Sequence, residues 1–306
     1  MGGRQLKVVF MGTPDFARAS LQKLLDEGHN ISGVFTQPDR AKNRGMKITH
    51  SPVKELSMRY GLRFFQPEKM RDGTALEMLR SCKPDLIAVV AYGRILPAEL
   101  LDLPPLGCVN LHASLLPELR GAAPIQWAIA RGYTETGVTT MLMAPELDSG
   151  DILLYNKTLI SEQDNAATLH DRLRDMGSVT LNDTLKKLQK GTISPIPQEH
   201  SKATYAPIIR RSDGKIDFTR PMQEINRFIL GMCPWPGAFT ENLKIHRAEP
   251  TGGVSEQPPG TVIQNTCVVC GDGRVLRLLE VQGPGGKRMP AEDYARGKSI
   301  QIIDER

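Results

Sequence analysis

The chain has 306 residues, 40% of them hydrophobic and 24% charged, and 39 Lys and Arg against 34 Asp and Glu give a formal net charge of +5. This composition excludes a disordered chain, and the length suits one large or two modest domains. The small charge excludes a wholly basic protein but allows a local contact with nucleic acid. No apolar run approaches the ~18 residues of a membrane span, and five scattered cysteines favour a reducing, cytoplasmic setting.

The first half of the chain alternates between short apolar runs and amphipathic segments. Buried strands are expected at 6–10, 31–36, 85–92 and 108–111. Helices are expected at 16–27, 52–60 and 121–130, the first with Thr13 as its cap and Pro14 at its first position. This alternation predicts an α/β fold with a Rossmann-like, open and mostly parallel sheet covered on both faces.

The pattern changes after residue 137. Two strands joined by a turn are expected at 137–143 and 151–159, followed by a long helix at 165–188. A segment rich in Pro, Ser and Thr comes next, and then short runs punctuated by Gly and Pro that favour an OB-like β-barrel. We therefore expect the chemistry in a domain at 1–190, a linker at 191–207 and a C-terminal barrel at 208–306.

The densest group of chemically useful residues lies at the strand expected at 108–111. Asn110 and His112 are two residues apart, so strand alternation puts both side chains on one face, and open α/β sheets bind ligands beyond the ends of such strands. An Asn amide can donate to a developing oxyanion, and a His can exchange a proton near neutral pH. A lone His is more often structural, but this pair with a following loop that ends at Pro117 favours a site.

A third group is needed to orient His112. Asp148 is the candidate, although its surroundings, Asp-Ser-Gly-Asp, are also ordinary for a turn, and the sequence alone cannot bring it to His112. Ser114 makes a Ser/His/Asp hydrolase an alternative. That alternative is weak, because the chain has no G-x-S-x-G elbow around Ser114.

A basic segment follows the second expected strand. Residues 37–47 carry one acid, Asp39, and four bases, which are Arg40, Lys42, Arg44 and Lys47. A solvated surface loop is one interpretation. The other is phosphate binding, because long basic loops between strand and helix are often functional.

Two further motifs are incomplete and do not indicate a binding site. The turn at Gly12 has one glycine rather than the G-x-G-x-x-G of dinucleotide-binding folds. Cys267 and Cys270 form one CxxC, whereas a structural zinc site needs four ligands. We therefore expect no bound metal, and we interpret the two cysteines as small apolar residues of a strand.

Several stretches resemble the superfamily of formyltransferases that use 10-formyltetrahydrofolate. They are F-M-G-T-P-D-F-A at 10–17, C-V-N-L-H-A-S-L-L-P at 108–117, R-G-A-A-P-I-Q-W at 120–127, L-D-S-G-D-I-L at 147–153 and P-W-P-G-A at 234–238. Within the superfamily, the basic segment, S-P-V-K at 51–54 and the P-W-P stretch resemble members that act on tRNA. Two positions depart from the usual pattern: Asn43 stands where Gly is common, and Ile208 where Lys is common.

The resemblance implies transfer of a formyl group from 10-formyltetrahydrofolate, a co-substrate, to the α-amino group of methionine on initiator tRNA, for translation initiation. It implies a catalytic set of Asn110, His112 and Asp148, in which Asp148 holds His112. It implies a folate site lined by Ser114, Leu115, Leu116 and Pro117. The tRNA acceptor stem would contact Arg40, Lys42, Arg44 and Lys47, the barrel would hold the tRNA backbone, and the enzyme would be a monomer.

Other functions stay open at this point. A related enzyme could formylate a nucleotide sugar, which would not need the basic segment, or hydrolyse the formyl-folate, which would release formate without an amine acceptor. A nucleic-acid-binding module would not need Asn110, His112 and Asp148 together. The serine hydrolase is the last alternative.

Overall fold

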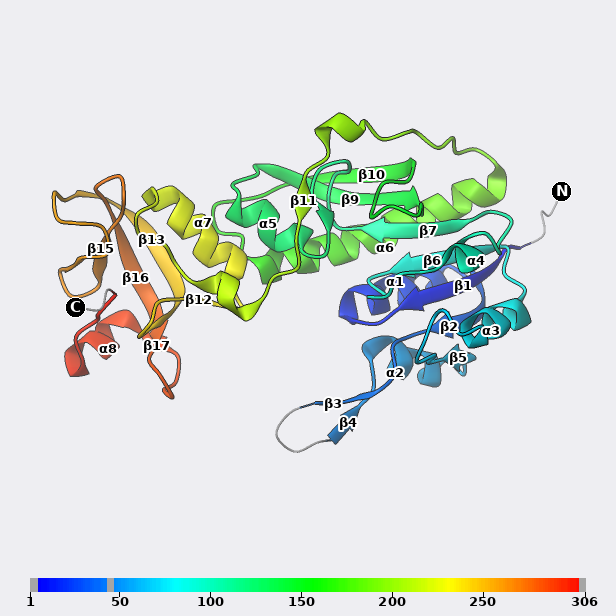
Figure 1. The fold of residues 1–306 in the computed structure, drawn as a ribbon, viewed down its shortest axis with the longest axis horizontal. Coiled ribbons are helices and arrows are strands. Elements are labelled where there is room, and N and C mark those ends of the chain that lie inside the picture. The colour runs from blue at the N-terminus through cyan, green and yellow to red at the C-terminus, as the bar shows by residue number, and fades with distance from the viewer. Residues whose placement is uncertain (1–4, 43–46, 303–306) are drawn as a thin grey trace. The chain divides into compact units, whose positions relative to one another are not determined.

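The computed structural model describes residues 5–42 and 47–302 (Figure 1). By its contacts the chain divides into two compact units. The first consists of Met1–Gly121, Gly137–Thr158 and His170–Tyr205. The second consists of Ala122–Thr136, Leu159–Leu169 and Ala206–Arg306. The division therefore does not follow chain order, since two inner segments belong with the C-terminal part.

A seven-stranded sheet organises the first unit, in the order β10-β9-β7-β6-β1-β2-β5. Its parallel strands are β5 (Phe64–Phe65), β2 (Asn30–Phe35), β1 (Lys7–Gly12), β6 (Leu86–Val90) and β7 (Cys108–His112). Beside β7 runs the antiparallel β9 (Glu135–Leu142), and β10 (Ile152–Leu159) forms the edge. The predicted Rossmann-like, mostly parallel sheet is confirmed.

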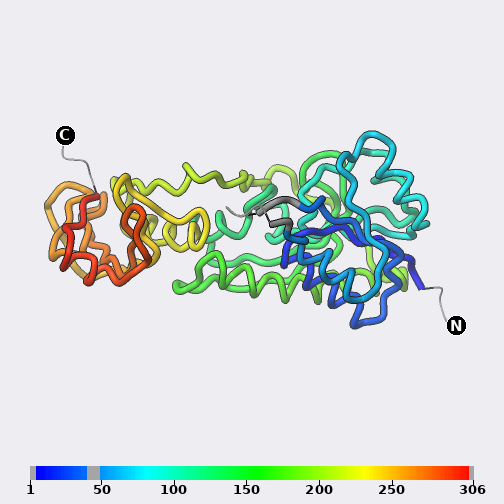
Figure 2. The backbone as a smooth tube through the Cα atoms, turned by 90° about the horizontal axis from the view of Figure 1, so that it is seen from below, coloured from blue at the N-terminus to red at the C-terminus, as the bar shows by residue number. Residues whose placement is uncertain are grey.

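Helices cover both faces of this sheet, as strand alternation requires. Val9, Ile87 and Cys108 belong to a buried cluster with residues of α3 (Thr74–Cys82) and α4 (Ala98–Leu101). On the other face, Leu111 lies so close to Gly177 of α6 (Ala166–Lys190) that a side chain at that position would meet it. In Figure 2 the green tube of α6 and the cyan tube of α3 and α4 lie on opposite sides of the sheet.

Two helix starts test the capping rules. Helix α2 (Pro52–Arg59) begins as the sequence indicates, because Ser51 Oγ accepts a hydrogen bond of 3.0 Å from Lys54 N. The first helix is present where the sequence indicates, but its predicted cap was wrong: α1 (Asp15–Asp26) starts at Asp15, and Pro14 occupies the cap position. Thr13 does not cap it, because its hydroxyl donates instead to the carbonyl of Tyr92, at 3.3 Å, beyond the end of the neighbouring β6.

The second unit is built on antiparallel strands. Their order is β12-β13-β16-β15-β14, with β17 also paired to β16. The bounds are β12 (Ala238–Phe239), β13 (Lys244–Val254), β14 (Val262–Ile263), β15 (Cys267–Val269), β16 (Arg274–Gln282) and β17 (Met289–Pro290). A C-terminal domain of antiparallel strands is therefore confirmed.

The second unit also contains the helices α5 (Pro124–Ala130), α7 (Met222–Met232) and α8 (Ala291–Gly297). The sequence patterns indicated only α5. Helices α5 and α7 pack so closely that a side chain at Gly231 would meet the backbone of Gln126. Cys267 and Cys270 are free, buried thiols, and burial raises the pKa of Cys270 to about 12, which suits an apolar core residue.

Short elements occupy segments that the sequence indicated as irregular. The basic segment is a hairpin, in which β3 (Arg40–Lys42) pairs antiparallel with β4 (Lys47–Thr49). Ile196, in the predicted linker at 191–207, makes an antiparallel bridge with Ile152. Thr204 O in the same segment accepts from Arg120 N of β8 (Arg120–Gly121) at 2.9 Å, just before β11 (Tyr205–Ala206). Within the described ranges, no helix combines the length and the apolar character that crossing a membrane requires.

The turn between β9 and β10 gives a test of close backbone packing. A Cβ at Gly150 would lie 1.8 Å from Leu142 O, whereas a Cβ at Gly252 of β13 would meet nothing within 4 Å. We expect Gly150→Ala to lower the free energy of unfolding by about 1–3 kcal/mol, because backbone must move. Gly252→Ala should change it by less than about 0.5 kcal/mol. Urea unfolding of both variants checks this, and equal midpoints would contradict the packing.

Candidate active site

Strand β7 presents two of the predicted catalytic side chains on one face. Its register pairs Asn110 with Met141 and His112 with Thr139 of β9, while Leu111 between them faces α6. His112 is buried, and Asn110 is half-buried. In the described part of the chain the Asn110 amide has no hydrogen-bond partner, so it is free to bind a ligand.

The structure brings Asp148 beside His112. Asp148 Oδ2 lies 3.5 Å from Nδ1 of His112 and also accepts a hydrogen bond of 2.8 Å from Gly121 N. On the other side of the ring, Nε2 of His112 lies 2.9 Å from the carbonyl of Leu119. A carbonyl only accepts, so Nε2 carries a proton, and a second proton on Nδ1 would point at the carboxylate. The arrangement therefore suits an imidazolium that forms during a reaction.

Asp148 reaches this position through an unusual backbone conformation. Its φ is +49°, in the left-handed region that few residues other than Gly, Asn and Asp adopt. The carbonyls of Asp148 and Gly150 both accept from the amide of Gln198, at 2.9 and 2.7 Å. The predicted turn is thus real, and it is held from outside by a segment distant in the sequence.

The loop after His112 uses its serine internally. Ser114 is completely buried, its hydroxyl donates to Glu118 O at 2.6 Å, and its carbonyl accepts from Thr139 Oγ1 at 2.7 Å. Thr139 Oγ1 also accepts from Leu116 N at 3.2 Å. A serine with these contacts shapes a loop, which argues against the hydrolase alternative. The lining of a folate site by Ser114, Leu115, Leu116 and Pro117 stays a prediction, for which the half-buried Leu115 and Pro117 offer open surface.

The sequence reasoning missed two buried polar residues next to this site. Arg120 and Gln198 are 3% and 5% exposed, and Oε1 of Gln198 accepts from Nε and Nη2 of Arg120 at 3.2 and 2.7 Å. Arg120 stands in the quoted R-G-A-A-P stretch, but Gln198 stands in a Pro-rich segment without periodicity. No local signal could therefore have paired them, since 78 positions separate them.

The basic hairpin is anchored at its base by its one acid. Asp39 accepts hydrogen bonds from Lys54 Nζ, from Nδ1 of His50 at 3.0 Å and from Nε2 of Gln66 at 3.0 Å. Burial raises the pKa of Asp39, but the bonds from Lys54, Gln66 and His50 together outweigh burial and hold the pKa below its ordinary value. Arg40 and Lys42 belong to β3 and Lys47 to β4, while Arg44 lies outside the described residues.

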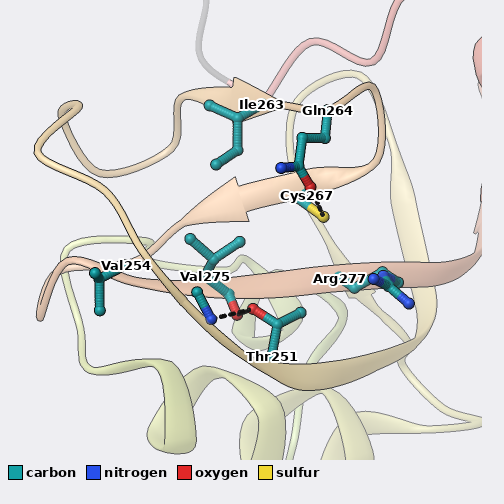
Figure 3. A pocket seen from close by; sticks show the side chains of 8 residues that line it. Thr251, Val254, Ile263, Gln264, Cys267, Val275 and Arg277 are labelled. Carbon is teal, nitrogen blue, oxygen red and sulfur yellow. Dashed lines mark hydrogen bonds between the residues drawn. The ribbon is translucent and has the colours of Figure 1, made fainter.

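A separate cavity of about 250 Å³ lies in the second unit, among strands β13 to β16 (Figure 3). It is lined by Thr251, Gly253, Val254, Ile263, Gln264, Cys267, Val275 and Arg277. Arg277 is the one charged residue in this set, and it lies 3.4 Å from Glu249. None of the predicted site residues belongs to it.

Comparison with known proteins gives matches along most of the chain. A family model described as formyl transferase matches residues 6–185, and one described as formyl transferase, C-terminal domain, matches 208–299. A methionyl-tRNA formyltransferase of Caldanaerobacter subterraneus is 46% identical over 303 residues, covering 96% of this chain and 98% of the relative. One of Bacillus velezensis is 46% identical over 306 residues, covering 97% and 96%.

Solved structures share the fold at low identity. An N-formyltransferase of Helicobacter canadensis, in complex with folinic acid and dTDP-3-aminofucose, has a TM-score of 0.71 and 18% identity, covering 90% of this chain and 99% of that chain. HypX of Aquifex aeolicus, in complex with tetrahydrofolic acid, has a TM-score of 0.64 and 16% identity, covering 95% of this chain and 47% of that chain. At these identities the likeness shows a common fold alone.

The anchor at Asp39 predicts a pH-dependent contribution to stability. Because the pKa of Asp39 is depressed in the folded state, its contribution is present above the unfolded-state pKa and is lost as pH falls through the folded-state pKa. Asp39→Asn should lower the free energy of unfolding by on the order of 1 kcal/mol near neutral pH, the scale of one charged hydrogen bond. The deficit should shrink toward about pH 3 and below, where wild-type Asp39 also becomes protonated.

Urea unfolding across this pH range is the measurement, with Glu256→Gln, a change at an exposed acid in the second unit, as control. A deficit for Asp39→Asn that stays constant down to the acid limit would show that the carboxylate charge plays no part.

Proposed function

The chain belongs to the formyl transferase family, and we propose that it transfers the formyl group of 10-formyltetrahydrofolate to the α-amino group of methionine on initiator tRNA. One observation carries the proposal: relatives named methionyl-tRNA formyltransferase are 41–46% identical to it over nearly their whole length and its own. The product, N-formylmethionyl-tRNA, serves translation initiation, in a reaction that we assign to the cytoplasm.

The chemistry needs a group that stabilises an oxyanion. The methionine nitrogen attacks the formyl carbon, and the carbonyl oxygen gains negative charge in the tetrahedral intermediate. The amide of Asn110 is the donor we assign to this oxygen, since electrostatic stabilisation of such an intermediate is a large part of acyl-transfer catalysis. His112, whose two nitrogens face Leu119 O and Asp148, is assigned to stabilise the oxyanion by its charge when protonated. The bond from carbon to the folate nitrogen then breaks. The amine loses one proton and the folate nitrogen gains one, so the step balances.

Asp148 keeps His112 ready for this role. Its carboxylate lies 3.5 Å from Nδ1, and the carbonyl of Leu119 holds the other nitrogen. With both nitrogens engaged, the ring has little freedom to turn. The burial of His112 and Asp148 supports the proposal further, because charge interactions strengthen where water is excluded.

Recognition of tRNA is the second part of the proposal. We assign the acceptor stem to the β3–β4 hairpin, which carries Arg40, Lys42 and Lys47 on its strands and Arg44 between them. Lysine and arginine neutralise backbone phosphates and supply most of the salt-dependent affinity for nucleic acid. The C-terminal domain of antiparallel strands would hold the tRNA backbone. The monomeric state stays a prediction.

The decisive assay follows formyl transfer from 10-formyltetrahydrofolate to methionyl-tRNA. We expect Asn110→Ala and Asp148→Ala each to lower kcat by about 100-fold or more, as removal of one oxyanion donor does elsewhere. Ser114→Ala should retain the chemistry, because its hydroxyl donates to the loop carbonyl of Glu118. Transfer to a nucleotide-sugar amine instead, or release of formate without an acceptor, would overturn the proposed function. Near-normal turnover in either catalytic variant would remove that residue from the set.

The hairpin is tested by the salt dependence of tRNA use. Replacing Lys42, Arg44 and Lys47 together by Ala should raise KM for tRNA at least 10-fold and flatten its dependence on salt, because about three phosphate contacts are lost. KM for the folate should stay the same. Lys187→Ala is a control at an exposed lysine in the last turn of α6. An unchanged KM for tRNA in the triple variant would show that the hairpin does not bind tRNA and is an ordinary surface element.

A further inference from the structure

The segment 196–204 does more than connect two parts of the chain. Within the first unit it pairs with the start of β10 through the bridge of Ile196 with Ile152, and it buries Gln198 to 5% exposure. Gln198 uses both ends of its amide: Nε2 donates to two carbonyls of the turn that carries Asp148, and Oε1 accepts from Arg120. Its side chain is therefore fully used, in contacts that reach two different loops.

The same segment also holds the other side of the His112 ring. Leu119 O accepts from Nε2 of His112, and Leu119 N donates to Thr204 Oγ1 at 2.8 Å. Arg120 N, the next amide, donates to Thr204 O at 2.9 Å. Thr204 thus fixes the backbone that supplies the acceptor for Nε2, while Gln198 fixes the backbone that supplies the acceptor for Nδ1.

Arg120, a buried residue, completes this network of hydrogen bonds. Its guanidinium donates to Oε1 of Gln198 and, at 3.1 Å, to Nδ1 of His200, and it is only 3% exposed. In the described part of the chain no carboxylate pairs with it, and its hydrogen-bond acceptors are Gln198 and His200. A buried charge that loses its partners is costly, and this cost keeps Gln198 in one orientation.

From these contacts we infer that Gln198, held by Arg120, is a positioning residue that sets the orientation of Asp148 toward His112. The inference rests on the proposed function, in which Asp148 holds His112. The turn at Asp148 needs an external support because φ of +49° is a sparsely populated conformation for a residue other than Gly. The two hydrogen bonds from Gln198 to Asp148 O and Gly150 O bracket the turn on both sides of Ser149.

The type of side chain matters to this role. A glutamate at 198 would still accept from Arg120, but it has no N–H to offer the two carbonyls. Gln198→Glu therefore cuts the link to the Asp148 turn and keeps the link to Arg120. The neighbouring Glu199 is exposed and pairs with Lys202 at 2.7 Å, so Glu199→Gln is a matched control in the same segment.

Kinetics of formyl transfer test the role. We expect Gln198→Glu to lower kcat by about 10- to 100-fold, because a small displacement of a catalytic group slows the reaction. KM for tRNA should change less than about twofold, because the substitution lies away from the proposed tRNA contacts. In an Asp148→Asn background the same substitution should lower kcat less than about threefold, since the effects of two residues that act through one another are not additive. Glu199→Gln should behave as wild type. Normal kcat in Gln198→Glu, or an equal loss in both backgrounds, would overturn the inference.

A readout without substrate separates this inference from the proposed function. Long-range ¹H–¹⁵N spectra report which nitrogen of a His ring carries a proton, and the chain has 6 His, so His112 is assigned by its loss in His112→Gln. Gln198→Glu should shift the ring signals of His112, and Glu199→Gln should not. If the wild-type protein does not formylate methionyl-tRNA, the proposed function is wrong. If the His112 signals do not shift in Gln198→Glu, the positioning role of Gln198 is wrong. Gln198→Asn, which keeps the amide but is too short to bridge, replaces Gln198→Glu if that variant does not fold.

Discussion

The contact between His112 and Asp148 is the constraint on which the rest of the site depends. A buried imidazole needs a partner for each nitrogen, because an unsatisfied buried polar group costs more than a typical hydrogen bond returns. Here the partners are the carbonyl of Leu119 and the carboxylate of Asp148, and each belongs to a loop with little regular structure. The loops must therefore be held by other groups, and those groups come from elsewhere in the chain.

The sheet supplies the rigid side of this arrangement. Strand β7 is hydrogen-bonded between β6 and the antiparallel β9, so Asn110 and His112 cannot change faces without breaking both ladders. The other side consists of the turn at Asp148 and the loop from Ser114 to Leu119. Gln198, Arg120 and Thr204 connect these two loops to one another, which explains why Gln198 is buried although it stands in a Pro-rich stretch without periodicity.

The two regions to which a function is proposed differ in burial and charge. Around His112 the groups are buried and have complementary partners, as acyl-transfer chemistry requires. The basic hairpin carries its charges on a two-stranded element whose base is fixed by Asp39, so the single acid of that segment is engaged with Lys54 rather than left among the bases. A modest net charge of +5 is thus compatible with binding tRNA, since the bases act locally.

The sequence by itself determined the fold class, the parallel strands β1, β2, β6 and β7, though not the short β5, and the placement of Asn110 and His112 on one face, because periodicity and alternation are local properties. Its motifs also determined the family and pointed to Asp148. Local patterns could not predict the hairpin within the basic segment, the start of α1 or the helices α7 and α8. Only the tertiary structure decided that Asp148 meets His112 and that Gln198 supports the turn between them. The reason is physical. Hydrogen bonds between residues dozens of positions apart depend on how loops fold back over the sheet, and such contacts produce no periodic pattern in the amino-acid sequence.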